Sequence, residues 1–449
     1  MKNNKYEIDM CNGTLMDKLI SFALPLMLSG MLQLMFNAVD IIVVGRFTGS
    51  TALAAVGSTT ALISTFTNLF IGVSLGANVL AARFYATGKA KEMSETVHTA
   101  IALAAISGVV MCIIGIAAAR EALVLIDTPD DVIGQAALYL RLYFCGMPFF
   151  MLYNYGAAIL RAVGDTKRPL MYLIIAGSTN AVLDLVLVII FKMGVAGVAI
   201  GTVTSQLISC ILVIRCLMTT ESDYKLRIRD LRIRKYYLLQ ILSVGLPAGI
   251  QSTVINFSNV LLQSSVNSFG EIAMAGYTAA NNILGFLYVS VNSITQACMS
   301  FTSQNYGVRK FKRMDKVLID CMILSVIVSV VIGGGSYILG RQMLGIYTNQ
   351  SEVIECGMEI LSISTIPYFL CGIMDMLPGA MRGVGYSAVP MVLSIVGTVG
   401  TRLVWIYGVF PSHRSLYELF ISYPASWFIT IVMQAICLVF VRKKVRNKE

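Results

Sequence analysis

The sequence predicts an all-α integral membrane protein with twelve transmembrane helices in two six-helix lobes. A pseudo-two-fold axis along the membrane normal is expected to relate the lobes. Two observations support this prediction: long apolar runs recur along the whole chain, and one half of the chain repeats the other. Of the 449 residues, 57% are hydrophobic and only 13% are charged. That charged share is about half of what a soluble protein carries.

The apolar runs are each long enough to cross a hydrocarbon core about 30 Å thick. Backbone N–H and C=O groups in lipid must be satisfied within the segment, so the runs are expected to be helices. The ten cysteines show no spacing typical of a metal site. The twelve expected spans are 15–44, 53–80, 95–119, 132–160, 169–191, 195–217, 237–268, 275–303, 317–340, 353–381, 388–410 and 416–441.

The internal repeat appears when the chain is shifted by 221 residues. RAVGDTKRPL (161–170) then falls on RGVGYSAVPM (382–391), so that charged, Gly and Pro positions in loops coincide. In the first span the offset is 222, which implies a one-residue gap nearby. Because each half has an even number of spans, the two copies enter the membrane in the same direction. The expected domains are an N-terminal lobe 1–217, a basic cytoplasmic linker 218–236 and a C-terminal lobe 237–449.

The net charge of +10 lies mainly in short loops between apolar runs. With the N-terminus in the cytoplasm, 27 of the 34 Lys and Arg residues fall on the cytoplasmic side. This distribution follows the positive-inside rule, so the charge indicates membrane orientation rather than nucleic-acid binding. Both termini are expected in the cytoplasm, in a multi-pass protein of the plasma membrane. The linker 218–236 is expected to be a part-helical segment on the membrane surface, with a solvated loop as the alternative.

Ionisable residues inside membrane spans are costly, and they are therefore functional candidates. The clearest acids within spans are Asp40, Asp184 and Asp375. Gln33 and Asn37 share a helix face with Asp40, and Asn180 lies one turn before Asp184. Two carboxylates with amide oxygens nearby form a hard-oxygen site that suits Na⁺, or a proton if like charge raises one pKa. No further metal site is expected.

Arg402 is a cation inside the eleventh span, where a buried charge needs a partner. Asp375 is the first candidate, and the two are expected to form a structural ion pair. A substrate-facing Arg402 is the alternative, and it would favour anionic substrates. Asp375 is in register with Asn154 under the 221-residue offset.

Three stretches together resemble one family: LPLMLSGMLQLMFNAVDIIVVGRF (24–47), RAVGDTKRP (161–169) and NAVLDLVLVIIFKMGVAGVAIGTVTSQ (180–206). In order and spacing, and with the repeat, they resemble the MATE (multidrug and toxic compound extrusion) family over essentially the whole chain. The resemblance implies two six-helix lobes in a V-shaped, alternating-access antiporter. Such a protein exports organic, often cationic compounds in exchange for Na⁺ or H⁺.

Within that family the chain is more similar to the DinF-like branch. That resemblance implies a cation-coupling site in the N-terminal lobe, made of Asp40, Tyr139, Asn154, Asn180, Asp184 and Thr202. The NorM-like branch instead has a Glu in the seventh span, where this chain has Ile255. Gln251 and Asn256 flank that position and are assigned, with Gln33 and Asn37, to the substrate cavity.

The function that the sequence favours is therefore secondary active efflux of small organic compounds. A flippase for a lipid-linked saccharide or another amphipathic substrate remains the alternative transporter. A membrane enzyme is not supported, because no HExxH, GxSxG or P-loop motif occurs. The expected partners are small organic substrates and the lipid bilayer, the expected state is a monomer, and no cofactor is expected beyond Na⁺ or H⁺ as coupling ion. The residues do not choose between these two ions or name the substrate.

Overall fold

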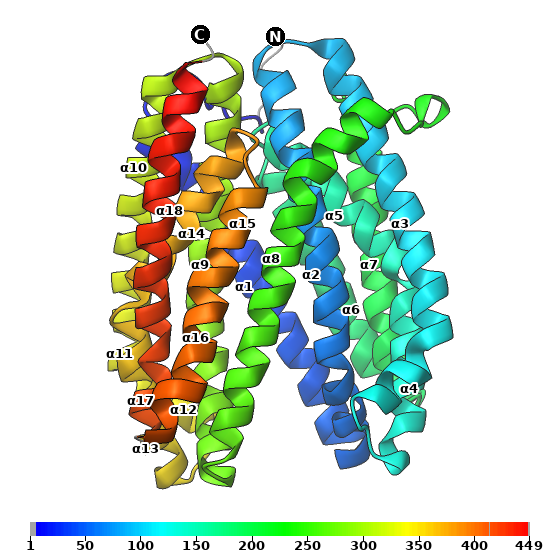
Figure 1. Cartoon of the computed structure of the whole chain (residues 1–449). Coiled ribbons are helices and arrows are strands. Elements are labelled where there is room, and N and C mark those ends of the chain that lie inside the picture. Colours follow the sequence, from blue (N-terminus) through cyan, green and yellow to red (C-terminus); the bar gives the residue numbers. More distant parts are fainter. Residues whose placement is uncertain (1–5, 413, 448–449) are drawn as a thin grey trace. The chain divides into compact units, whose positions relative to one another are not determined.

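The computed structural model describes residues 6–412 and 414–447, and this part of the chain consists of helices and loops without a strand (Figure 1). Ten of the described helices are long and apolar enough to cross a membrane. Two further pairs, Asp130–Cys145 with Met147–Ala162 and Ser351–Thr365 with Tyr368–Gly383, are each bent by 46°. Counted as one span each, the bent pairs complete the twelve predicted spans. The predicted fold class is confirmed.

The described chain forms two compact units. Unit 1 holds residues 6–8 and Leu28–Leu246, and unit 2 holds Asp9–Met27 and the chain from Pro247 onwards. These units differ from the expected lobes at the first and seventh spans. The start of the first helix belongs to unit 2, and the start of the seventh span belongs to unit 1.

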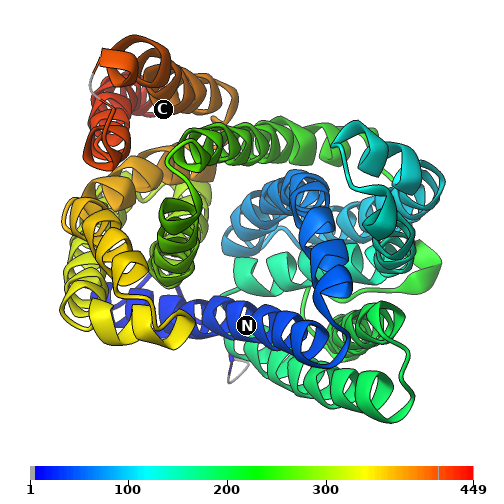
Figure 2. The ribbon, with the colours of Figure 1, turned by 90° about the horizontal axis from the view of Figure 1, so that it is seen from below.

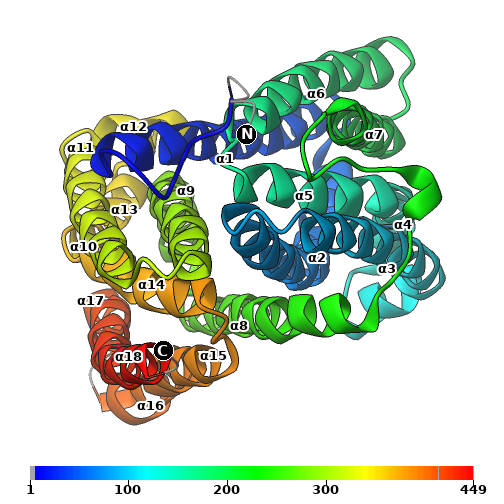
Figure 3. The same ribbon diagram turned by 90° about the horizontal axis from the view of Figure 1, so that it is seen from above.

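The helices of unit 1 follow one another with short connections. They are α1 (Met16–Phe47, from Leu28 onwards), α2 (Ser50–Ala86), α3 (Ala90–Leu125), α4 (Asp130–Cys145), α5 (Met147–Ala162), α6 (Lys167–Leu185), the π-helix η1 (Val186–Ile190), α7 (Val195–Thr219), the 3₁₀ turn η2 (Ile228–Asp230) and the beginning of α8 (Lys235–Asn267). Within the unit, α5 lies at the centre and packs against α2, α3 and α7 (Figure 3).

The helices of unit 2 repeat this order. They are the remainder of α8, then α9 (Glu271–Gly307), α10 (Phe311–Val328), η3 (Ser329–Gly333), α11 (Gly334–Ile338), α12 (Gly340–Tyr347), α13 (Ser351–Thr365), α14 (Tyr368–Gly383), α15 (Ala388–Ser394), η4 (Ile395–Gly400), α16 (Thr401–Val404), η5 (Trp405–Val409), η6 (Phe410–Ser412), α17 (Leu416–Phe420) and α18 (Ser422–Arg446). Here α14 is central and packs against α9, α10 and α18.

The backbone preserves the repeat seen in the sequence. Both α2 and α9 follow a glycine with positive φ, Gly49 at 98° and Gly270 at 93°. The turns after α5 and α14 contain Gly164 at φ 92° and Gly385 at φ 95°. Left-handed φ values of this kind favour glycine, because a Cβ would clash with the backbone.

Proline accounts for the two bent spans. Pro148 is the second residue of α5, and Pro367 immediately precedes α14. A proline has no N–H to donate to the preceding turn, and its ring clashes with that turn. Each span therefore breaks and starts again in a new direction, which a hydropathy pattern alone does not show.

The basic linker lies against unit 1. Between α7 and α8 its only described helical piece is the single turn η2, so the expected part-helical surface segment is much reduced. Tyr224 and Leu226 are buried, and the backbone N–H of Arg227 donates to His98 Nε2 at 3.0 Å. Arg232 forms an ion pair with Glu95 of α3 at 2.5 Å. Specific contacts therefore attach the linker to the unit, and it is not a free solvated loop either.

Candidate functional site

Unit 1 contains a cavity of about 410 Å³ among α1, α2, α4, α5, α6 and α7. Figure 3 views these helices from one end, and Figure 2 views them from the opposite end. Seven of the predicted site residues line this cavity, although they come from five different helices: Gln33, Asn37, Asp40, Tyr139, Asn154, Asn180 and Thr202. The structure therefore brings together almost all of the residues that the sequence assigned to the N-terminal site.

The two acids lie beside and behind this cavity. Asp40 lines it and is 9% exposed, whereas Asp184 is fully buried. The amide of Asn180 donates to Asp184 Oδ1 at 3.2 Å. The carboxyl groups of Asp40 and Asp184 are electrostatic neighbours of each other. Asp40 Oδ1 and Asp184 Oδ2 are both buried and accept no hydrogen bond from the described residues.

Two neighbouring carboxyl groups with bare buried oxygens are unfavourable in a membrane unless positive charge neutralises them. The ligands here are hard oxygens, which suit Na⁺, and the pair also suits a shared proton. Within residues 6–412 and 414–447, no group of three or more His, Cys, Asp or Glu side chains could hold a metal ion. The oxygen atoms of this site can thus take up a cation or a proton.

Helix α7 approaches the acids through a glycine. A Cβ built on Gly201 would lie 2.2 Å from Asp184 Oδ1 and 3.4 Å from Asn180 Nδ2. Any side chain at this position would therefore displace the carboxylate. Gly201 was not among the predicted site residues, because its role depends on how closely two helices approach each other.

Nine further polar residues of the cavity were not predicted from the sequence: Thr59, Thr60, Ser64, Thr67, Tyr143, Tyr153, Ser205, Gln206 and Ser209. Tyr143 lies one turn after Tyr139, and the centres of the two rings are 6.3 Å apart. Ser205 follows Thr202 by three residues and so lies on the same face of α7. Extending the predicted polar faces of α4 and α7 by one turn would have identified Tyr143 and Ser205.

Unit 2 contains buried cations in place of an acid pair. Arg402 is 3% exposed, its Nη1 donates to Asn259 Oδ1 at 2.8 Å, and its Nε donates to Ser426 Oγ at 3.4 Å. The guanidinium carbon lies 4.2 Å from the ring centre of Tyr423. The ion pairs among the described residues do not include the expected one between Arg402 and Asp375. In this structure neutral and aromatic groups of α8 and α18 surround the guanidinium instead.

Asp375 has a different charged neighbour, Arg382. Arg382 is itself buried, and its Nη2 donates to Gln251 Oε1 at 2.6 Å. Gln251, which was assigned to the substrate cavity, thus holds a buried arginine. Asn256, assigned to the same cavity, is half-buried on α8. The tenth expected span ended at residue 381, and in the structure α14 continues through Arg382 to Gly383.

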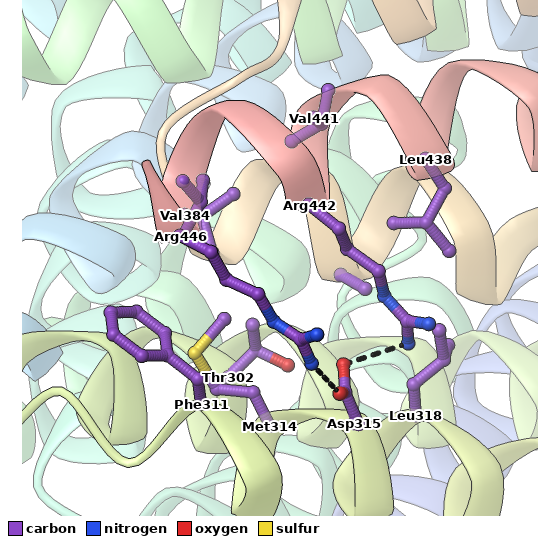
Figure 4. A pocket seen from close by; sticks show the side chains of 12 residues that line it. Thr302, Phe311, Met314, Asp315, Leu318, Val384, Leu438, Val441, Arg442 and Arg446 are labelled. Carbon is purple, nitrogen blue, oxygen red and sulfur yellow. Dashed lines mark hydrogen bonds and ion pairs between the residues drawn. The ribbon is translucent and has the colours of Figure 1, made fainter. Parts of the chain in front are cut away.

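A second pocket, at one end of unit 2, is too small for an organic substrate (Figure 4). Its volume is about 30 Å³, which is roughly the volume that one molecule occupies in liquid water. Asp315 of α10 pairs there with Arg442, at 3.1 Å, and with Arg446. These ion pairs attach the end of α18 to α10, so the contact is structural.

Comparisons with known proteins agree on one family. The family model described as MatE matches residues 25–186 and 247–407, one segment in each half of the chain. The chain is 29% identical to "Probable multidrug resistance protein YoeA" of Bacillus subtilis (strain 168), over 92% of this chain and 91% of that protein. It is 22% identical to "Multidrug export protein MepA" of Staphylococcus aureus (strain NCTC 8325 / PS 47), over 84% of each chain.

Solved structures share the fold. One, described as the outward-facing conformation of a multidrug resistance MATE family transporter of the MOP superfamily, matches with a TM-score of 0.89 at 20% identity. The match covers 100% of this chain and 99% of that one. Another, from Pyrococcus furiosus, is described as having a binding pocket of reverse polarity that suggests a different function. It matches with a TM-score of 0.87 at 20% identity, over 100% and 98%. Because the family model covers more than half of the residues, with one match in each repeat, this chain belongs to the MATE family of membrane transporters.

Proposed function

We propose that this protein exports small organic, mainly cationic compounds by alternating access, driven by Na⁺ or H⁺ that binds at Asp40 and Asp184. The observation that carries the proposal is the acid pair itself, whose bare buried oxygens adjoin a cavity in unit 1. The cavity volume of about 410 Å³ lies in the range of small-molecule sites, which is roughly 300–1,000 Å³. The relatives named as multidrug proteins support the same function.

The charge of the cavity supports cationic substrates. Among its described lining residues Asp40 is a carboxylate, and none is Lys, Arg or His. Aromatic rings of Phe36, Tyr139 and Tyr143 add faces on which an organic cation can pack. A lipid-linked saccharide, the flippase alternative, carries anionic phosphate that Asp40 would repel.

Coupling follows from differential affinity. A cation or proton that binds the acid pair more tightly in one state of the transporter shifts the equilibrium toward that state. The bound ion also removes the negative charge that attracts a cationic substrate at Asp40. By linkage, substrate must weaken ion binding by the same factor. Ion and substrate therefore alternate at the same unit.

The function is tested with purified protein in lipid vesicles loaded with a fluorescent cationic dye. An imposed gradient of Na⁺ or of H⁺ should drive dye transport against its concentration gradient. Protein-free vesicles with the same gradients serve as the control. Dye movement that only equilibrates, whatever the ion gradient, would identify a pore and contradict the proposal.

The proposed orientation places both termini in the cytoplasm of a cell whose plasma membrane holds the protein. Contacts within unit 1 support this orientation, because they hold the N-terminal segment at the same end of the unit as the basic linker. The hydroxyl of Tyr85, at the end of α2, donates to Glu7 at 2.6 Å, and that of Tyr224 in the linker donates to Glu7 at 2.8 Å. Impermeant labelling of single cysteines introduced at 83–94, 161–168, 218–236 and 305–316 should place these loops on the cytoplasmic side. Labelling of 120–131 should occur from outside, and finding it on the same side as 218–236 would contradict the twelve-span topology. Lys2, Lys5 and Lys448 are among the 27 basic residues expected on the cytoplasmic side, and they lie outside the described residues.

Gly201→Ala should weaken ion coupling while the protein still folds. The new Cβ would displace the carboxylate of Asp184, the residue that it meets at 2.2 Å. We expect the ion concentration for half-maximal transport to rise by about tenfold, which corresponds to roughly 1.4 kcal/mol. Gly57→Ala in α2 is the matched control, because nothing lies within 4 Å of a Cβ at Gly57. Equal ion dependence in the two variants would show that the close contact at Gly201 does not matter.

A further inference from the structure

The internal repeat allows the site of unit 1 to be compared with the corresponding place in unit 2. The 221-residue offset between the two halves aligns the helices of the two units. For example, α7 begins at Val195 and α17 begins at Leu416, 221 residues later. Three residues that line the unit 1 cavity have these counterparts: Asn37 corresponds to Asn259, Thr202 to Tyr423, and Ser205 to Ser426.

The two acids have no acidic counterpart. Leu262 stands where the repeat would place the equivalent of Asp40, and Trp405 stands in place of Asp184. Leu262 is completely buried. Unit 2 therefore has neither carboxylate at this place, whereas the neutral positions around it hold the same or another uncharged residue.

The three neutral counterparts all contact one cation, Arg402. Asn259 accepts a hydrogen bond from Nη1, Ser426 accepts one from Nε, and the ring of Tyr423 faces the guanidinium carbon at 4.2 Å. Arg402 itself corresponds to Ala181, the residue after Asn180. The charged end of this side chain thus lies among the groups whose equivalents in unit 1 line the same cavity as Asp40.

The backbone in both units departs from the α-helix next to this place. The π-helix η1 begins at Val186, two residues after Asp184, in unit 1, and the π-helices η4 and η5 flank Arg402 in unit 2. π-helical turns are rare and often occur at functional sites. Both units therefore carry a local distortion of the helix near this place, although only unit 1 carries the acids.

We propose that Arg402 is a built-in cation that permanently fills the unit 2 counterpart of the ion-coupling site. Carbonyl, hydroxyl and aromatic groups solvate its guanidinium, much as they would solvate a free organic cation, but the side chain cannot dissociate. Unit 2 then takes up no exchangeable ion at this place, and each transport cycle is driven through unit 1 alone. This last consequence rests on the proposed function, whereas the occupancy of the unit 2 site does not.

Chemical rescue tests the proposal. Purified Arg402→Ala protein should melt roughly 5–10 °C below the wild type, because the buried groups lose their cation. Guanidinium chloride at about 10 mM should recover a large part of this loss in a saturable manner, because a ligand that binds only the folded state stabilises it. Urea has nearly the shape of guanidinium but no charge, so it should recover nothing. Equal effects of urea and guanidinium, or no saturable recovery, would overturn the proposal.

Matched variants separate this effect from a general one. Arg341→Ala removes an exposed arginine of unit 2 that pairs with Glu355, and it should show no rescue. If Arg402→Ala does not fold, Arg402→Lys and Arg402→Met decide instead. The lysine keeps the charge and should retain more folded protein than methionine, which has similar length. A methionine variant as stable as the lysine variant would show that no cation is needed there.

Measurements of ion binding test this proposal separately from the proposed function. Asp40→Asn should remove all exchangeable binding of Na⁺, measured with radioactive Na⁺, and all substrate-linked proton release. Ion binding that persists in Asp40→Asn and is removed by Asp375→Asn would place an exchangeable ion near Arg382 in unit 2. That result would overturn the conclusion that unit 1 alone drives each cycle. If the wild type binds neither ion, the coupling function fails, whereas guanidinium rescue of Arg402→Ala would still support the built-in cation.

Discussion

Asp40→Asn and Asp184→Asn should each abolish gradient-driven efflux while leaving a folded protein in the membrane. Both carboxyl groups have a buried oxygen that accepts no hydrogen bond from the described residues, so neither is required to hold a structural donor there. An asparagine imitates a protonated carboxyl in shape and removes the negative charge. The ion then loses its differential affinity, and without that difference it cannot shift the transport equilibrium. Dye transport under an imposed gradient should fall to the rate measured without one.

The controls for this experiment lie in both units. Asp130→Asn changes an exposed acid at the start of α4 and should leave efflux unchanged. Asp375→Asn changes the membrane acid of unit 2, which has Arg382 as its charged neighbour, and should leave ion dependence unchanged. Size-exclusion profiles confirm that each variant is folded. Normal gradient-driven efflux in both Asp40→Asn and Asp184→Asn would refute the unit 1 assignment, and the coupling site would then be sought at Asp375.

Gly76→Val should prevent folding of most of the protein. A Cβ on Gly76 in α2 would lie 2.0 Å from the carbonyl oxygen of Ile241 and 2.9 Å from the nitrogen of Gly245, both in α8. On the other side, a Cβ on Gly245 would lie 2.5 Å from the carbonyl oxygen of Val73. The two helices thus pack backbone against backbone, as small residues allow in membranes. Neither backbone can move aside as a flexible side chain would.

Gly76→Val should lower the free energy of unfolding by more than the roughly 1–3 kcal/mol that ordinary overpacking costs, because the clash is with backbone atoms. The measurement is the yield of monodisperse protein after detergent extraction, together with its melting temperature. Gly57→Val is the matched control, since it lies on the same helix and has nothing within 4 Å of its Cβ. A yield for Gly76→Val equal to that of Gly57→Val would contradict the observed helix contact.

Much of the unit 1 site could be predicted because its residues follow local rules. Asp40 and Asn37 share one helix face, Asp184 and Asn180 share another, and acids are rare enough in apolar spans to stand out. Tyr139, Asn154 and Thr202 came from family resemblance, and all three line the cavity. The sequence could not show which faces of the different helices meet. The role of Gly201 could not be predicted for the same reason, because it depends on how closely α7 approaches Asp184.

The charged residues of unit 2 show the opposite outcome. Asp375 and Arg402 were expected to pair because they are unlike charges in neighbouring spans, yet Arg402 contacts Asn259, Ser426 and Tyr423. Neutral hydrogen-bond acceptors and an aromatic face can accommodate a guanidinium in place of a carboxylate. Amide, hydroxyl and aromatic side chains are common in every span, so no pattern marks those that will meet a cation.

The sequence by itself determined that this chain is a twelve-span membrane protein built from a repeated unit, with an acid pair in its first half. These features depend on composition, on periodicity along one helix and on self-similarity, all of which are local or one-dimensional. Only the tertiary structure decided which polar residues share a cavity, where α2 and α8 touch, and which groups surround Arg402. Such contacts join residues far apart in the chain, and they depend on helix direction and separation, which the order of residues does not specify.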